Sequence, residues 1–170
     1  QYLGDQEYYD AQQSYRQTLN HLSEMLQFEP DRILIDNHPG YEVSKYGQAL
    51  AEKKDIPITA IQHHEAHIAA VLAENNLLQT TKPILCVAWD GTGFGTDGQI
   101  WGGEFFKYEN GSFKRIAHLA YFPMIMGDKM SREPRLSALS LLYDMPAAIA
   151  ILKKKFNYKE WTLYNAVLRM

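Results

Sequence analysis

The sequence has one cysteine, no long apolar run and no large excess of either charge. Cys86 alone cannot form an internal disulfide or a cysteine-based zinc cluster. No apolar run approaches the roughly 18 residues that a membrane-spanning helix needs. With 17 Lys and Arg against 20 Asp and Glu, the formal net charge is −3, which excludes a strongly basic nucleic-acid-binding protein and an acidic disordered tail. We therefore expect neither nucleic acid nor a membrane among its partners.

The first ten residues, QYLGDQEYYD, lack the basic segment and the apolar stretch of a secretory signal peptide. A cytoplasmic protein is therefore the expectation. Gln1 is not a natural start, and the helical pattern that runs to Met170 has no C-terminal capping signal. We expect a fragment of a longer protein. Its composition, 46% hydrophobic and 22% charged, is that of a globular protein with a hydrophobic core.

The first half of the chain alternates helical and strand patterns. Apolar residues at spacings of three and four predict helices, and short apolar runs between breakers predict strands. The expected helices span residues 8–28, 41–54 and 63–76. The expected strands span residues 32–36, 56–61 and 83–89. Because crossovers of helix length imply parallel strands, we expect a βαβαβ unit whose sheet is covered by helices.

The pattern changes after Trp89. A glycine-rich stretch leads into a strand pattern over residues 99–108, and Asn110-Gly111 is a hairpin turn signal before a returning strand over 113–121. Helical patterns then dominate, over residues 128–143, 146–156 and 159–169. The halves thus differ in type, and we expect an α/β protein with two lobes, one over residues 1–82 and one over 83–170.

Three of the six histidines lie within five residues, in the sequence QHHEAH. On a helix, His63 and His67 are four residues apart and share a face, which lets two imidazoles reach one metal ion. His64 and His67 offer a second such pair, but His64 shares a stripe with Ile68 and Leu72 and is the histidine expected to pack inside. The H-E-x-x-H motif would need a histidine at position 68, so a metalloprotease is excluded. Polar residues at a helix start, without a metal, are the simpler alternative.

Asp90 ends the third expected strand. Residues at the carboxyl ends of parallel strands face the ligand crevice of a sheet, which makes Asp90 a candidate third ligand beside His63 and His67. Two histidines and one carboxylate suit non-haem Fe²⁺, and they also suit Zn²⁺. An aspartate that only forms a turn is the alternative.

The stretch DGTGFGTDG, which begins at Asp90, is a candidate phosphate site. A dinucleotide-binding loop opens a helix and a P-loop ends in Gly-Lys-Ser/Thr, whereas this stretch opens a strand and lacks that lysine. We expect a hairpin turn whose backbone N–H groups approach an anion closely, with threonine hydroxyls as further donors. A wide hairpin without a ligand is the alternative. The candidate residues are Gly91, Thr92, Gly93, Gly95, Thr96, Asp97 and Gly98.

A dense set of both charges begins the expected helix over residues 128–143, in the sequence GDKMSREPR. Arg132 and Arg135 are candidate anion-binding residues, because guanidinium groups bind phosphate or carboxylate bidentately. Ion pairs between neighbouring side chains on the helix surface are the alternative.

Taken together, in their order and approximate spacing, these motifs resemble the HypF family of carbamoyltransferases, which act in [NiFe]-hydrogenase maturation. The matching segments are IQHHEAHIA at 61–69, DGTGFGTDG at 90–98, WGGEF at 101–105 and GDKMSREP at 127–134. The turn DNHPGY is similar to the family's D-L-H-P-D-Y. The resemblance covers nearly the whole chain and corresponds to the central part of the family's transferase domain. It implies an actin-like, RNase H-like two-lobed ATPase fold, of which this chain holds a parallel βαβαβ part and an antiparallel hairpin part.

The resemblance also implies an activity. The family uses ATP and carbamoyl phosphate to form carbamoyl adenylate, and it then carbamoylates the C-terminal cysteine of the acceptor protein HypE. His63, His67 and Asp90 match the family's ligands to a divalent metal, Fe or Zn, and the glycine-rich stretch matches its phosphate- and nucleotide-contacting segment. A divalent metal and ATP are therefore the expected cofactors, and carbamoyl phosphate and a HypE-like acceptor are the expected partners. Because parts of the family's nucleotide site have no counterpart in this sequence, we expect the chain alone not to catalyse the transfer.

Other interpretations stay open beside a piece of a HypF-type carbamoyltransferase. One is an O-carbamoyltransferase of the same fold. Another is a metal-dependent hydrolase in which the three candidate ligands activate water, although no general base at a suitable spacing is evident. A third is a non-catalytic nucleotide-binding module. The chain departs from the family at Met126, where the family's P-G-G-D has a glycine.

Overall fold

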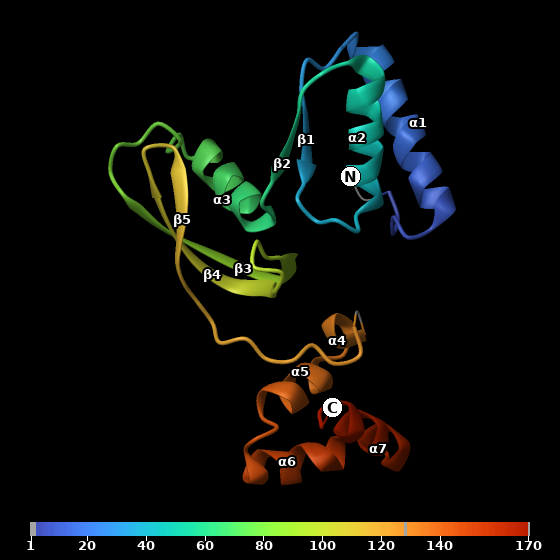
Figure 1. Ribbon diagram of the computed structural model, residues 1–170, viewed down its shortest axis with the longest axis vertical. Coiled ribbons are helices and arrows are strands. Elements are labelled where there is room, and N and C mark those ends of the chain that lie inside the picture. The colour runs from blue at the N-terminus through green and yellow to red at the C-terminus, as the bar shows by residue number, and fades with distance from the viewer. Residues whose placement is uncertain (1–2, 128, 170) are drawn as a thin grey trace. The chain divides into compact units, whose positions relative to one another are not determined.

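The computed structural model describes residues 3–127 and 129–169. The chain splits into two compact units, Gln1–Ala117 and His118–Met170, and each is described here by itself (Figure 1). The first unit combines helices with two sheets, and the second is helical. The mixed α/β fold is therefore confirmed. A lobe boundary at residues 82–83 stays a prediction.

The first part of unit 1 pairs two parallel strands and packs a helix on them. Its elements are α1 (Tyr9–Leu26), β1 (Ile33–Asp36), α2 (Glu42–Lys54) and β2 (Ile58–Ile61). The register runs from Ile33 opposite Ile58 to Asp36 opposite Ile61, so both strands end at the same edge. A Cβ at Gly47 would lie 2.7 Å from Ile35 Cγ2, and the glycine therefore lets α2 approach β1 closely. These elements lie where the sequence pattern predicts them.

The second part of unit 1 packs one helix on an antiparallel sheet. Its elements are α3 (His63–Glu74), β3 (Ile84–Phe94), β4 (Ile100–Glu109) and β5 (Ser112–His118). Ile68 and Leu72 of α3 form a core with Cys86 and Ala88 of β3 and with Phe106 of β4. The predicted Asn110-Gly111 turn is present, with φ values of 51° and 75°, as a two-residue type I′ hairpin requires.

The third strand was predicted to extend the parallel sheet, and this prediction is wrong. β3 pairs antiparallel with β4, from Ile84 opposite Tyr108 to Phe94 opposite Ile100. The sheet order is β3-β4-β5, and among the described residues β3 pairs with neither β1 nor β2. A short connection joins β3 to β4, so this pairing closes a much smaller loop than a crossover would.

The hairpin turn predicted for residues 91–98 is only partly correct. β3 continues through this stretch to Phe94, with a register shift between Trp89 and Gly93. The chain then turns between Gly95 and Gln99, where Gly95 N–H donates to the Gln99 carbonyl. A strand follows this turn, so the exclusion of a dinucleotide-binding loop is confirmed.

Unit 2 is a small helical cluster with an apolar core. Its elements are α4 (Lys129–Arg132), α5 (Pro134–Leu141), α6 (Pro146–Leu152), the 3₁₀ turn η1 (Lys153–Lys155) and α7 (Tyr158–Val167). The helix predicted over residues 128–143 is interrupted at Glu133, because proline disfavours the helical conformation in the residue before it. The core residues are Ile125, Met130, Leu136, Leu139, Phe156 and Tyr164. Met126, where the resemblance implies a glycine, has a φ of 64° in the left-handed region that favours glycine.

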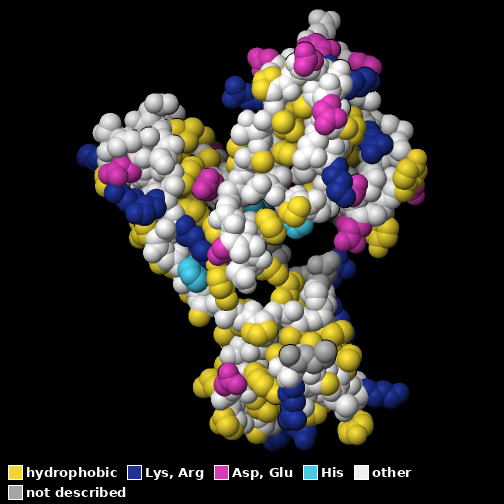
Figure 2. Space-filling model, in the orientation of Figure 1, with side chains coloured by type: hydrophobic (Ala, Val, Ile, Leu, Met, Phe, Trp, Pro, Cys, Tyr) yellow, Lys and Arg dark blue, Asp and Glu magenta, His cyan; other side chains and the backbone are white. Residues whose placement is uncertain are grey.

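Several apolar side chains remain on the surface. On the face seen in Figure 2, hydrophobic side chains reach the surface over α1 and α2 and over the helical unit. Leu85, Val87 and Trp89 alternate along β3 on the face opposite Cys86 and Ala88, and they are 65%, 50% and 75% exposed. Among the described helices, none combines the length and the apolar character that crossing a bilayer requires.

Candidate metal centre

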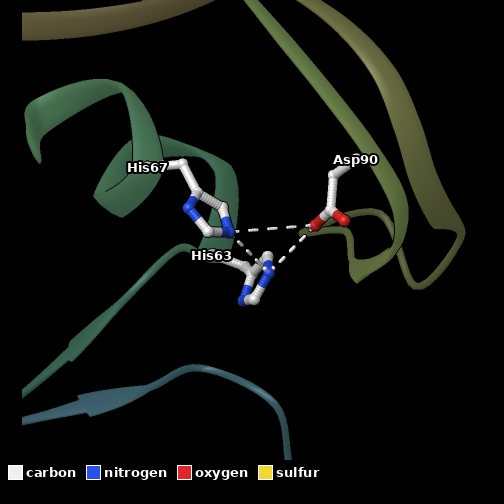
Figure 3. A group of neighbouring side chains, drawn as sticks. All are labelled: His63, His67 and Asp90. Atoms are coloured by element: carbon white, nitrogen blue, oxygen red, sulfur yellow. Dashed lines mark hydrogen bonds and ion pairs between the residues drawn. The ribbon is translucent and has the colours of Figure 1, made fainter. Parts of the chain in front are cut away.

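The structure brings together the three side chains predicted as metal ligands (Figure 3). His63 and His67 lie on α3, and Asp90 lies on β3. His63 Nε2 is 3.2 Å from His67 Nε2 and 3.0 Å from Asp90 Oδ2, and His67 Nε2 is 4.0 Å from the same oxygen. One donor atom from each residue thus lies within 4.8 Å of the other two. As the sequence predicts, the four-residue spacing places both imidazoles on one face of the helix, close enough to reach one ion.

The start of α3 fixes where these histidines lie. β2 ends at Ile61, and the Gln62 side chain caps the helix by accepting a hydrogen bond from Glu65 N–H at 3.0 Å. His63 is therefore the first helical residue, at the edge where β1 and β2 both end. Asp90 reaches the same place from β3, which packs against α3 through the core of unit 1.

Asp36 borders the cluster, and sequence reasoning did not name it as a site residue. Its Oδ2 lies 2.7 Å from His63 Nδ1, and its Oδ1 accepts from His38 N–H at 2.8 Å. A neutral His63 that donates from Nδ1 to Asp36 keeps the lone pair of Nε2 directed at Asp90, as histidine ligands of metals commonly do. The signal was present in the sequence, because Asp36 ends β1 at the sheet edge where β2 leads into His63.

The arrangement fits a divalent cation. In this tautomer His63 Nε2 and Asp90 Oδ2 are both acceptors, only 3.0 Å apart, and acceptors at that distance repel unless a cation or a proton lies between them. Asp90 Oδ2 is buried without a hydrogen-bond partner in the described structure, whereas Oδ1 accepts from Gly91 N–H at 2.6 Å. Two imidazole nitrogens on one tetrahedral ion lie about 3.3 Å apart. The observed 3.2 Å agrees with that value.

His64 is the packed histidine, as expected from its stripe. Its side chain is fully buried, and its ring lies 5.6 Å from the Trp101 ring, measured between centroids. Burial lowers the pKa of His64, and the charge of Asp90 opposes this effect only in part. His64 Nε2 is 3.9 Å from Asp90 Oδ2, beyond hydrogen-bond distance. The residue therefore borders the cluster as a neutral imidazole.

The DNHPGY turn borders the cluster on another side. The rings of His38 and Tyr41 stack at 4.1 Å, and His38 meets Phe94 edge to face at 5.3 Å. Burial raises the pKa of Tyr41, and the charges of Asp36 and Asp90 raise it further. The phenol therefore stays protonated and keeps its O–H as a donor beside the carboxylates.

Two of the predicted phosphate-site glycines are required by packing. A Cβ at Gly93 would lie 2.2 Å from His64 Cε1, and a Cβ at Gly95 would lie 2.1 Å from Trp101 Nε1. Real Cβ atoms do not approach other atoms this closely, so both positions need glycine whether or not an anion binds. Both glycines are buried.

The other residues of the stretch are mostly exposed. Gly91, Thr96 and Gly98 lie at the surface, and the Thr92 side chain lies outside the described part of the structure. Asp97 fixes the turn, since its Oδ1 accepts from Gln99 N–H at 3.0 Å and from Trp101 Nε1–H at 2.8 Å. The N–H groups of Gly91, Gly95 and Gly98 already donate to Asp90 Oδ1, the Gln99 carbonyl and the Gly95 carbonyl. Phosphate binding by these residues stays a prediction.

The two candidate anion-binding arginines belong to unit 2. Arg135 forms a bidentate pair with Glu133, with Nε–Oε1 and Nη2–Oε2 distances of 2.8 Å each. The hydrogen bond from Arg135 lowers the pKa of Glu133 to about 2. Arg132 is exposed at the end of α4, and Asp128 of the same motif lies outside the described residues. Anion binding by Arg132 and Arg135 stays a prediction.

Two family models match the chain. The model for the HypF Kae1-like domain matches residues 1–74. The model described as "Carbamoyltransferase, Kae1-like Domain, second subdomain" matches residues 86–170. Together these matches leave out only the connection between α3 and β3 and the first residues of β3. All the candidate ligands lie inside the matched ranges.

Similar proteins carry the same family name. The "Carbamoyltransferase HypF" of Synechocystis sp. is 41% identical over 143 residues, which are 84% of this chain and 18% of that protein. A full-length HypF solved in a phosphate- and nucleotide-bound form matches 99% of this chain and 22% of its own, at 29% identity and a TM-score of 0.83. The crystal structure of T. kodakarensis HypF matches 85% of this chain and 19% of its own, at 34% identity and a TM-score of 0.74. The chain thus spans about a fifth of the length of these relatives.

Proposed function

The chain belongs to the HypF family, and from that membership we propose that the protein carrying it is a carbamoyltransferase with a divalent metal held by His63, His67 and Asp90. The observation that carries the proposal is the buried Asp90 Oδ2, which has no hydrogen-bond partner in the described structure and faces two imidazole nitrogens. An unpartnered buried carboxylate oxygen is costly unless a cation compensates it. Fe²⁺ and Zn²⁺ both accept this donor set.

In the proposed site each residue has a separate task. Asp36 orients His63 from the far side of the ring, and the backbone N–H of Gly91 orients Asp90. His67, which is 63% exposed, lies on the open side of the cluster. A bound ion would supply Lewis-acid stabilisation of the charge on phosphate oxygens. The exposed part of the glycine-rich stretch, beginning at Gly91, lies directly beside Asp90 and offers backbone to such a ligand.

We propose ATP and carbamoyl phosphate as substrates, carbamoyl adenylate as the intermediate, and the C-terminal cysteine of a HypE-like protein as the acceptor. Support comes from the carbamoyltransferase name of the relatives and from the phosphate- and nucleotide-bound form of one of them. Phosphate binding by the glycine-rich stretch is part of this proposal, and it would bring phosphate oxygens near the ion. Anion binding by Arg132 and Arg135 is proposed separately, for unit 2 by itself.

Mass spectrometry of the acceptor tests the proposed reaction. The full-length protein, given ATP and carbamoyl phosphate, is expected to add the mass of one carbamoyl group to the C-terminal cysteine of the acceptor. His63→Ala and His67→Ala should abolish this gain and lower the metal content. His21→Ala, in an exposed histidine of α1, is the matched control and should change neither. Transfer at the wild-type rate by both site variants would contradict the proposal.

A further inference from the structure

Two buried polar atoms beside the candidate metal centre have no hydrogen-bond partner in the described structure. They are His64 Nε2 and Asp90 Oδ2, and they lie 3.9 Å apart. A buried donor or acceptor without a partner destabilises the folded state. Because the two atoms face each other, a small movement would let them form a hydrogen bond with each other.

The neighbours of Gln62 fix which nitrogen of His64 carries the proton. Gln62 Oε1 accepts from Glu65 N–H at 3.0 Å, and Gln62 Nε2 donates to the Phe94 carbonyl at 3.1 Å. Both partners are backbone groups with invariable roles, so the amide has one orientation. The same Nε2 lies 3.1 Å from His64 Nδ1, which must then be an acceptor. His64 is therefore protonated at Nε2, which is the atom that faces Asp90.

Packing holds the ring in this position. The Cα of Gly93 lies directly against the imidazole, since a Cβ there would be 2.2 Å from Cε1. Trp101 borders the ring at 5.6 Å, between centroids. The side chain is fully buried. The donor direction is thus set before any ligand arrives.

We infer that His64 is a positioning residue for Asp90, whose Oδ2 accepts a hydrogen bond from His64 Nε2–H when the carboxylate binds the metal ion. This inference rests on the proposed metal centre. Gly91 N–H holds Oδ1, and His64 would hold Oδ2, so that both carboxylate oxygens would have a donor and the carboxylate one orientation. A carboxylate oxygen has lone pairs for both a metal ion and a donor. His64 thus serves the site without being a ligand.

Zn²⁺ titration of the metal-free full-length protein tests this role. His64→Leu removes the donor and keeps an apolar side chain in the core, and we expect its dissociation constant for Zn²⁺ to rise about 10–100-fold. His64→Gln keeps an N–H donor near the position of Nε2, and we expect it to recover most of the affinity. His21→Leu is the control for loss of an exposed histidine and should leave the constant unchanged. A residue that only fills space would not separate Leu from Gln in this way.

A crystal structure of the Zn²⁺-loaded wild-type protein gives a second readout that needs no variant to fold. The Nε2–Oδ2 distance is expected to fall below about 3.2 Å, and a distance above about 3.5 Å would overturn the inference. Equal affinities of wild type and a folded His64→Leu would overturn it as well. Failure of the wild type to bind Zn²⁺ or Fe²⁺ would instead overturn the metal centre itself, so the two failures are distinguishable.

Discussion

The two units bury different kinds of residue. The interior of unit 1 includes Gln62, His64 and Glu104, which are 7%, 0% and 1% exposed. The interior of unit 2 is built on residues such as Leu136 and Leu139, both fully buried. Among the described residues of unit 2 the buried polar side chain is Ser140, whose hydroxyl donates to the Pro123 carbonyl. Buried polar groups are kept only where something compensates them, so unit 1 is where a ligand is expected.

Within unit 1 the buried polar groups fall into two classes. Glu104 is satisfied, since Arg115 Nε donates to it at 2.6 Å and the Arg115 guanidinium also lies 3.9 Å over the Trp101 ring. His64 and Asp90 each retain an unpartnered atom. The first class stabilises the sheet, and the second belongs to the proposed metal centre, with Asp90 as a ligand and His64 as its positioning residue. The contrast separates residues that hold the fold from residues proposed to serve an ion.

Truncating the apolar core of unit 2 is expected to have the largest effect on stability. Leu136→Ala should lower the free energy of unfolding of this unit by about 2–5 kcal/mol, because it leaves a cavity in a fully buried position. Hydrogen exchange of peptides from α5 and α7 measures the loss. Leu141→Ala, on the same helix but 59% exposed, is the matched control and should cost less than about 0.5 kcal/mol. Weaker Zn²⁺ binding by Leu136→Ala would contradict the separation of the units' tasks.

Adding one methyl group at Gly93 should affect both stability and the metal centre. The new Cβ of Gly93→Ala would displace the His64 ring, at a cost of about 1–3 kcal/mol, and would lower Zn²⁺ affinity as well. Gly91→Ala is the control, since nothing lies within 4 Å of its Cβ position. Urea unfolding and Zn²⁺ titration of both variants check this. If Gly91→Ala destabilises the protein as much as Gly93→Ala, the packing explanation is wrong.

Removing the charge of Asp36 should weaken the metal centre with little effect on folding. Asp36→Asn keeps an oxygen for His38 N–H but loses the carboxylate that faces His63 Nδ1. We expect the dissociation constant for Zn²⁺ to rise about 10–100-fold. Asp31→Asn, an exposed aspartate before β1, is the control. An unchanged constant in Asp36→Asn, measured by calorimetry, would remove Asp36 from the site.

The smallest expected effect is a pH dependence confined to unit 2. The pKa of Glu133 is about 2 in the folded protein and near the ordinary 4.5 in the unfolded chain. The unfolded chain therefore binds the proton first, so the stabilisation is complete above about pH 4.5 and is lost as the pH falls toward 2. The effect is small, because solvent still reaches and screens this half-buried pair. Urea midpoints of wild type and Glu133→Gln should differ at pH 6 and converge near pH 2, and a constant difference would contradict this origin.

Local sequence patterns predicted the elements and the ligands of the candidate site. The i, i+4 spacing of His63 and His67 needs only a helix, and the position of Asp90 needs only the end of an apolar run. Partners distant in the sequence were not predictable in the same way. β3 could pair with β2 through a helical crossover or with β4 through a short turn, and in the structure it pairs with β4. The local pattern of β3 does not decide between these two partners. Position 93 needs glycine because the His64 ring, on another element, packs against it. The spacing of residues along the sequence does not predict such a contact.

The outer face of β3 has a practical consequence. Leu85, Val87 and Trp89 form an exposed apolar row beside the polypeptide edge of a short sheet. Rows of this kind favour association between molecules through water-excluding contacts. In a solution of the isolated 170-residue chain, the light scattered per unit mass of protein is therefore expected to rise with concentration. Charged substitutions at Val87 and Trp89 would keep it dispersed, because these side chains contribute little to the buried core.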